Sequence, residues 1–347
     1  MFEELDEAIA TLGRNTTLSS DAWSRYDGVY SGNIAQWLKY ANSLKLRMAM
    51  RLTEVKPELA KTKAAEAIAG GVITSNADNA AMHAAENRTT LIYNDWGDHR
   101  VGADILCYMT GYNDPRVEKM FLPNDAGNYV GIRIGIDVAG KSTAMAKYSN
   151  LIVESTTPYL WFNAAEATFL RAEYELRWGS EETARELYEE AIRLSFEERG
   201  ASGADAYVAD ATSRPAAYTD PLGSYSAAAQ STITIAWTPG ADNFEANLER
   251  IITQKWIAIF PLGVEAWSEH RRTGYPRLLP VVADKSGGGV DVAQGARRLP
   301  YPVEEYQQNN TNLQAAIQQL NAEQTNGNRT GDQMGTRVWW DSKPYNN

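Results

Sequence analysis

Two distant stretches of this chain carry the same pattern of small side chains, and the pattern restricts how their helices pack. In each stretch an amphipathic helix is followed by a break and a returning helix. The returning helices carry small side chains at the first and last of three positions about one turn apart: Ala60, Ala64 and Ala67 in one, and Ala184, Tyr188 and Ala191 in the other. Because small side chains let two helices approach closely, each stretch is predicted to be a helical hairpin.

The first hairpin is predicted within residues 30–71. Apolar residues recur at three- and four-residue spacings over Asn33–Thr53, as in an amphipathic helix. Pro57 suits the first turn of the next helix, and Gly70 with Gly71 suits its end.

The second hairpin is predicted within residues 157–199. One long helix is expected over Pro158–Trp178, and Gly179 should break it. Ser180 is a good N-cap for a return helix over Glu181–Glu198. The pattern is typical of tetratricopeptide hairpins, although an ordinary alanine-rich helix pair looks the same in a single copy. Its recurrence favours true repeats, and the intervening segment excludes a tandem array.

The segments 72–156 and 200–242 are irregular and rich in polar or small residues. A short helix is expected at Gly102–Thr110 and one strand at Thr232–Trp237. Long insertions in a helical scaffold are where binding sites usually lie, so the two segments are predicted to form a loop-rich ligand-binding lobe. The fold predicted for 1–347 is therefore one mostly α domain. It combines a scaffold of tetratricopeptide-like helical hairpins (an α/α superhelix), an irregular loop-rich lobe, and a C-terminal helix and tail over 243–347.

Composition excludes some classes of function. A net charge of −11 repels phosphate backbones, so nucleic acid is not an expected partner. The single Cys107 excludes an internal disulfide framework, and no apolar run is long enough to span a membrane. The N-terminus has no signal-peptide pattern, which indicates either a cytoplasmic protein or a trimmed piece of an exported one. The ten Trp and 18 Tyr suit flat, amphipathic ligands such as sugars.

The stretch Ile252–Leu278 is the most informative segment for function. It is predicted to be a helix that packs Trp256, Phe260 and Trp267 and ends in the turn Arg271–Pro276. This turn is expected to be architectural, with one of its arginines paired to a carboxylate or to a helix C-terminus. The stretch resembles a signature of the SusD/RagB-like proteins. Further blocks resemble the same family in the expected order: Trp37–Arg51, Tyr112–Arg116, Ala165–Arg177, Arg297–Tyr306 and Trp339–Asp341.

The resemblance implies a nutrient-binding protein that performs no chemistry. Members of the family bind glycans or other nutrients at the cell surface and pass them to a SusC-like, TonB-dependent transporter of the outer membrane. The implied localisation is the outer membrane, with a lipid anchor in the full-length protein that this chain does not contain. Family members carry an N-terminal helical region before the helix at Trp37, so we expect that region to be missing from the numbered chain.

One loop combines aromatic and polar residues in the way a sugar site requires. Aromatic rings stack on the C–H faces of sugars, while amides, carboxylates and guanidinium groups bond their hydroxyls. The predicted ligand-binding residues of the loop are Tyr93, Asn94, Asp95, Trp96, Asp98 and Arg100. Tyr108 and Tyr112 are expected to extend the same face, and Tyr207–Tyr225 is a weaker candidate. The family has no fixed sugar-binding motif, so this choice rests on residue chemistry alone.

Other kinds of site are less well supported. Asn94, Asp95 and Asp98 could ligate Ca²⁺ but lack the spacing of an EF-hand, and the histidines show no zinc pattern, so neither metal nor cofactor is predicted. A glycoside hydrolase would need two carboxylates facing each other across a cleft, whereas Glu265 and Glu269 lie on one helix face, where ion pairing is simpler. A groove in the hairpins that holds a peptide is the alternative to nutrient binding.

Overall fold

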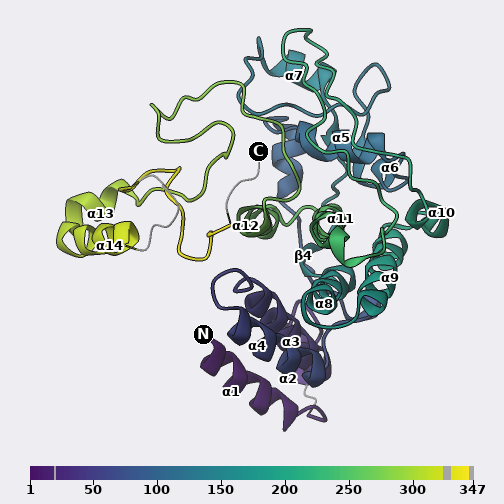
Figure 1. Cartoon of the computed structure of the whole chain (residues 1–347), viewed down its shortest axis with the longest axis vertical. Coiled ribbons are helices and arrows are strands. Elements are labelled where there is room, and N and C mark those ends of the chain that lie inside the picture. Colours follow the sequence, from purple (N-terminus) through teal and green to yellow (C-terminus); the bar gives the residue numbers. More distant parts are fainter. Residues whose placement is uncertain (19–20, 323–329, 344–347) are drawn as a thin grey trace.

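The computed structural model describes residues 1–18, 21–322 and 330–343, and helices dominate it (Figure 1). Parts of the predicted C-terminal tail, at 323–329 and 344–347, lie outside the described residues. The longer helices are α1 (Phe2–Gly13), α3 (Ile34–Met50), α4 (Pro57–Gly70), α5 (Ala103–Gly111), α8 (Ala164–Trp178), α9 (Glu181–Arg199), α11 (Phe244–Ala258), α12 (Gly263–Thr273) and α14 (Asn310–Ala322). The shorter ones are α2 (Asp21–Tyr26), α6 (Val117–Met120), α7 (Lys141–Lys147), α10 (Ala204–Val208), α13 (Val303–Gln308), η1 (Asn76–Asp78), η2 (Leu91–Asp95) and η3 (Ala241–Asn243). The strands are β1 (Ala80–Met82), β2 (Phe121–Leu122), β3 (Asn150–Leu151) and β4 (Tyr159–Phe162).

The first predicted hairpin is α3 packed against α4, with α1 lying on α3. Asn33 caps α3, because its Oδ1 accepts a hydrogen bond from Gln36 N at 3.2 Å. Ala60, Ala64 and Ala67 are fully buried. Their small side chains allow the close approach of the two helices that the spacing predicts.

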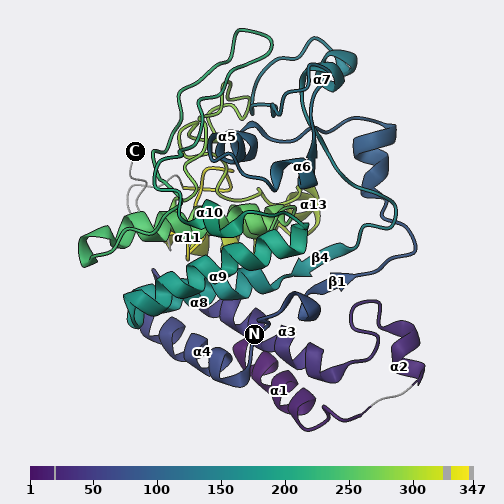
Figure 2. The ribbon, with the colours of Figure 1, turned by 90° about the vertical axis from the view of Figure 1, so that its right-hand side faces the viewer.

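The second predicted hairpin is α8 packed against α9. Ser180 caps α9 by accepting a hydrogen bond from Thr183 N. Ala184, Tyr188 and Ala191 are all fully buried, and α8 also packs against α3, α4 and α11 (Figure 2). The mostly α prediction with tetratricopeptide-like hairpins is therefore confirmed. The helix predicted over Gly102–Thr110 is also present, as α5.

Residues Tyr159–Phe162 form a strand, which corrects the prediction of one helix over Pro158–Trp178. This strand, β4, pairs antiparallel with β1. Helix α8 begins after Asn163, whose Oδ1 accepts a hydrogen bond from Glu166 N at 2.9 Å. A short run of large apolar residues does not distinguish strand from helix by periodicity, and the partner strand lies far away in the sequence.

The stretch Ile252–Leu278 contains two helices rather than the single helix predicted. Helix α11 ends at Ala258 and α12 begins at Gly263, with Pro261 between them. Proline removes a helical hydrogen bond and clashes with the preceding turn, so one continuous helix could not pass through this position. The strand predicted at Thr232–Trp237 is absent as well, because this segment is irregular in the structure.

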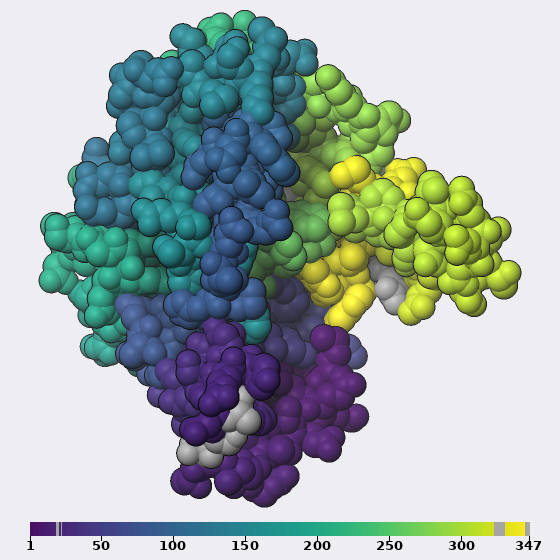
Figure 3. Space-filling view, turned by 180° about the vertical axis from the view of Figure 1, so that it is seen from behind, coloured from purple at the N-terminus to yellow at the C-terminus, as the bar shows by residue number. Residues whose placement is uncertain are grey.

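The helical hairpins and the irregular segments occupy different ends of the molecule. Helices α1–α4 lie at one end, α5–α7 with their connecting loops lie at the other, and α11 and α12 lie between them (Figures 1 and 2). Helices α13 and α14 project from one side of the body (Figure 3). The division of the chain into scaffold and ligand-binding lobe stays a prediction.

A buried network of ion pairs connects α3, α8, α11 and α12. Its centre is Arg272, which is fully buried and bonds both oxygens of Glu173, at 2.6 and 2.7 Å. It also bonds Glu269 at 2.7 Å and Thr53 at 2.9 Å. The carboxylates of the network are Glu166, Glu173, Glu265 and Glu269, and its cations are Arg47, Arg51, Arg177, Lys255 and Arg272. The architectural role predicted for the Arg271–Pro276 turn is thus confirmed for Arg272.

Candidate functional site

The loop predicted to bind ligand is built on η2, a single π-helical turn over Leu91–Asp95. Trp96 N donates to Leu91 O at 2.7 Å and closes this turn. Asn94 Nδ2 donates to Val153 O at 3.1 Å, and Asn150 Nδ2 donates to Tyr93 O at 3.2 Å. These bonds hold the turn against the β3 segment, so its side chains are presented on a fixed backbone.

Trp96 presents its indole to solvent at the end of this turn. Its side chain is 54% exposed, although large aromatic residues are more often buried. Gly97 follows with a φ of +62°, a conformation that favours glycine. Asp98 pairs with Lys141 of α7 at 3.0 Å. Asp95, which directly precedes Trp96 in the sequence, is exposed. An exposed ring with charged neighbours offers both stacking and hydrogen bonding to a sugar.

Arg100 closes the loop and retains unused hydrogen-bonding capacity. Its Nη1 donates to His99 O at 2.8 Å and to Asn150 Oδ1 at 3.2 Å. Its buried Nε has no hydrogen-bond partner among the described residues. Burial lowers the pKa of Arg100 and, in the same way, raises the pKa of Tyr93.

Tyr108 and Tyr112 do not extend the face of the Tyr93–Arg100 loop, which corrects the prediction for these two residues. They are 3% and 2% exposed, respectively. Tyr108 Oη donates to Arg277 O at 3.0 Å, and Tyr112 Oη donates to Ile233 O at 3.1 Å. Tyr108 on α5 and Tyr112 directly after it are therefore part of the core rather than of an exposed face.

An aromatic groove near the hairpin of α3 and α4 is not among the sites predicted from the sequence. It has a volume of about 720 Å³. Trp23, which is 54% exposed, and Tyr26 lie beside Trp37 of α3 and Trp161 of β4. Trp37 Nε1 donates to Asp27 Oδ2 at 2.7 Å, which fixes one wall. The aromatic residues come from separate parts of the chain, so no single sequence window contains the groove.

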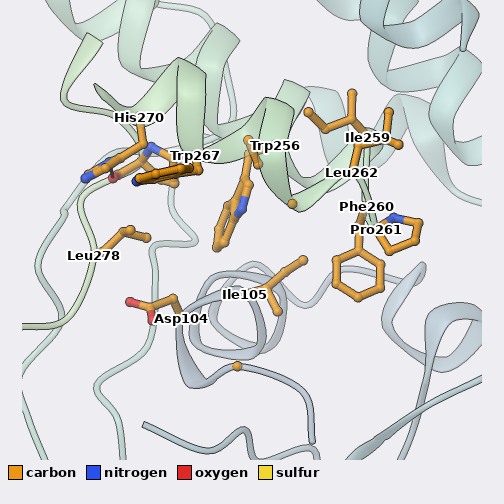
Figure 4. Close-up of a pocket in the computed structure, with 14 residues that line it drawn as sticks. Asp104, Ile105, Trp256, Ile259, Phe260, Pro261, Leu262, Trp267, His270 and Leu278 are labelled. Atoms are coloured by element: carbon orange, nitrogen blue, oxygen red, sulfur yellow. Dashed lines mark hydrogen bonds between the residues drawn. The ribbon is translucent and has the colours of Figure 1, made fainter. Parts of the chain in front are cut away.

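A second apolar cavity lies between α5 and the two helices of the Ile252–Leu278 stretch. Its volume is about 280 Å³. Trp256 points from α11 toward Ile105 of α5, with Trp267 on one side and Phe260 on the other (Figure 4). Asp104 is the one carboxylate among the lining residues, and burial raises its pKa. The cavity thus presents aromatic surface with little polar chemistry.

Other observations bear on ions and membranes. Among residues 1–18, 21–322 and 330–343, no group of three His, Cys, Asp or Glu side chains could hold a metal ion. In the same described part of the chain, no helix is both long and apolar enough to cross a membrane.

Comparisons with known proteins place the chain in a family. No curated protein matches it in sequence. A SusD homologue from Bacteroides thetaiotaomicron is 50% identical, with a TM-score of 0.94 over 99% of this chain and 73% of its own. A chitin-binding SusD homologue from Flavobacterium johnsoniae is 40% identical, with a TM-score of 0.90 over 99% of this chain and 71% of its own. The family model described as SusD-like, Susd and RagB outer membrane lipoprotein, matches residues 1–341, and the chain therefore belongs to this family of outer membrane lipoproteins.

Proposed function

We propose that this protein captures an oligosaccharide at the outer-membrane surface, without catalysis, and passes it to a SusC-like TonB-dependent transporter. The observation that carries the proposal is the exposed Trp96 indole on a turn held by backbone hydrogen bonds. Family membership and the chitin-binding relative support a sugar as the ligand.

The chemistry of the Trp96 loop suits a modest-affinity sugar site. The indole would stack on the apolar face of one sugar ring, and Asp95, Asp98 and Arg100 would bond its hydroxyls. Because the turn is already ordered by its hydrogen bonds, little backbone entropy is lost on binding. Desolvation of sugar hydroxyls offsets much of the hydrogen-bond gain, so affinity should be weak to moderate.

The carboxylates support binding rather than hydrolysis. Glu265 and Glu269 are engaged by Arg51 at 2.7 Å each, and neither lines one of the three pockets described above and below. Burial alone would raise their pKa values, but the surrounding cations hold both below the usual range. A general acid for glycoside hydrolysis needs a raised pKa instead. Asp104 has a raised pKa but is the one carboxylate that lines its cavity.

Hand-over to a transporter would use another surface. The hairpin end, α1–α4, lies opposite the end formed by α5–α7 (Figure 1). A transporter could therefore dock on the hairpins while the irregular segments hold the ligand. Co-purification of this protein with the SusC-like transporter of its source organism tests this step, and failure to co-purify in detergent would contradict it.

The aromatic groove carries the second candidate function, peptide binding. Trp23, Tyr26, Trp37 and Trp161 form an apolar wall beside the N-terminal hairpin. Such a groove would accommodate apolar side chains of an extended peptide. The two candidate sites can be distinguished by substitution, because Trp96→Ala changes only the Trp96 loop and Trp23→Ala changes only the aromatic groove.

Calorimetric titration with neutral oligosaccharides, chitin fragments included, tests the proposal. Trp96→Ala should abolish binding, while Trp23→Ala, at a tryptophan of equal exposure, should leave it unchanged. Equal thermal transitions would show that both variants fold. Binding lost only in Trp23→Ala would assign the sugar to the aromatic groove. A parent protein that binds no oligosaccharide but binds apolar peptides in a Trp23-dependent manner would replace the proposal with peptide binding.

A further inference from the structure

A polar pocket with an excess of positive charge lies beside α11, and it shares no lining residue with the apolar cavity between α5, α11 and α12. Its volume is about 640 Å³, and it is formed by α11 with segments 211–214 and 229–234. Arg214, Arg250 and Arg277 all line it, and Glu249 is the one carboxylate among the lining residues. The chain as a whole carries a net charge of −11, so this concentration of cations opposes the overall charge.

The single carboxylate is already engaged. Glu249 Oε2 lies 3.6 Å from Arg277 Nε, and Glu249 Oε1 accepts a hydrogen bond from Ser231 Oγ. Neither Arg214 nor Arg250 forms an ion pair with a carboxylate of the described residues, and both line this pocket. The buried Arg250 attracts an anion more strongly than a guanidinium group in open solvent would, and the exposed Arg214 adds a second positive charge beside it.

Arg250 is buried without a carboxylate partner among the described residues. It is 6% exposed, and its three hydrogen bonds go to neutral oxygens: Thr234 O at 3.2 Å, Thr234 Oγ1 at 3.1 Å and Asn247 Oδ1 at 2.9 Å. A guanidinium group has five N–H donors, so two remain without an acceptor. Burial lowers the pKa of Arg250, as expected for a cation with incomplete compensation.

Arg214 is held at the mouth of the pocket by its backbone. Its side chain is exposed and forms no ion pair among the described residues. Its carbonyl oxygen packs against Gly111 so closely that a Cβ there would lie 2.3 Å away. The neighbouring Ala216 N donates to Cys107 O at 2.8 Å. These contacts with helix α5 therefore fix the backbone position of Arg214.

Two buried tyrosines hold the backbone of two residues that line the pocket. Tyr108 bonds the carbonyl of Arg277, and Tyr112 bonds the carbonyl of Ile233, at 3.0 and 3.1 Å. Both carbonyls belong to residues that line the pocket. These bonds and the lining residues on α11 preorganise the pocket, which reduces the entropy lost on binding.

We propose that this pocket binds the carboxylate of an acidic sugar, a uronic acid unit of an oligosaccharide. The carboxylate would lie between Arg214 and Arg250, and the sugar hydroxyls would bond Gln230, Thr232 and Thr234. A neutral sugar could accept hydrogen bonds from the two guanidinium groups but would not balance their charge, whereas a carboxylate does both. The choice of a sugar rests on the proposed function, whereas the choice of an anion rests on the pocket itself.

Titration with trigalacturonate at low ionic strength tests this site. The parent protein should bind, and Arg214→Gln should bind about tenfold more weakly, because one charge-assisted contact is lost. Arg185→Gln is the matched control, since it removes an exposed arginine on α9 that does not line the pocket. It should retain the parent affinity, and added salt should weaken binding to the parent protein.

Two further titrations separate this proposal from the proposed function and from a general anion site. Trp96→Ala should keep trigalacturonate binding even if it loses neutral oligosaccharides, so the two proposals fail independently. Inorganic phosphate that binds in an Arg214-dependent manner, without competition from trigalacturonate, would show an anion site that does not accept sugars. Equal trigalacturonate affinity of Arg214→Gln and the parent, or no binding by the parent, would overturn the proposal.

Discussion

Replacing Arg272 by methionine should destabilise the protein far more than replacing a surface arginine. Arg272 is fully buried and joins Glu173 of α8 to Glu269 of α12. Methionine keeps an unbranched apolar stem but lacks the charged head, so both ion pairs and the hydrogen bond to Thr53 are lost. The free energy of unfolding should therefore report mainly on the carboxylates that remain.

The expected loss of free energy of unfolding depends on which cations remain paired with each carboxylate. Removal of one partner from a buried pair typically costs ~3–5 kcal/mol. Glu173 would retain Arg177 at 2.7 Å, and Glu269 would retain Arg51 at 2.7 Å and Lys255 at 3.2 Å. Neither carboxylate becomes fully uncompensated, so we expect the lower end of this range, about 3 kcal/mol.

Urea denaturation at pH 7 measures the effect, with Arg193→Met as the matched control. Arg193 lies on α9, is 39% exposed, and pairs with Asp205 at 2.8 Å. A surface pair of this kind contributes about 0–1 kcal/mol. If Arg272→Met lost no more free energy of unfolding than Arg193→Met, the ion-pair network would not be the stabilising junction we infer.

Two other predictions concern pH and packing. Burial, with Arg297 nearby, lowers the pKa of His270 to about 4, whereas an unfolded histidine titrates near 6.5. Between these two pKa values His270 is protonated in the unfolded chain but not in the folded one, so stability should fall as the pH is lowered from 7 to 5. Thermal melts of His270→Gln should show a smaller fall over the same pH range. An equal fall in the variant and the parent protein would contradict the assignment. Gly111→Ala should destabilise the protein by about 2 kcal/mol, because its Cβ would lie 2.3 Å from the carbonyl of Arg214. Gly13→Ala, which meets nothing within 4 Å, should be neutral in the same urea assay, and equal stability of the two variants would refute the packing argument.

The helical hairpins could be predicted because their signals are local. Asn33 and Ser180 cap α3 and α9 as their residue types suggest, and Pro57 opens α4. The small residues of the returning helices, such as Ala60 and Ala184, are buried as their spacing predicts. Each of these signals lies within one or two turns of the backbone that it shapes.

Two of the errors arose where the deciding partner is remote, whereas the division of Ile252–Leu278 into two helices follows from Pro261 within the stretch. Tyr159–Phe162 is a strand because β1 pairs with it, although residues 83–158 separate the two strands in the sequence. Tyr108 and Tyr112 resemble an exposed aromatic face in sequence, but they bond carbonyls of Arg277 and Ile233, which come from much later in the chain. Aromatic and polar residues near one another predict a binding surface only if the fold leaves them exposed.

The sequence by itself determined the helical scaffold, the family and the chemistry available to a binding loop. Periodicity and capping act over a few residues, so they can be read without coordinates. The tertiary structure alone decided which aromatic rings reach solvent and which cations converge. Arg214, Arg250 and Arg277 meet at one pocket only because α5 and α11 hold their segments together. Burial and electrostatic compensation depend on contacts between distant segments, and no sequence window contains such contacts.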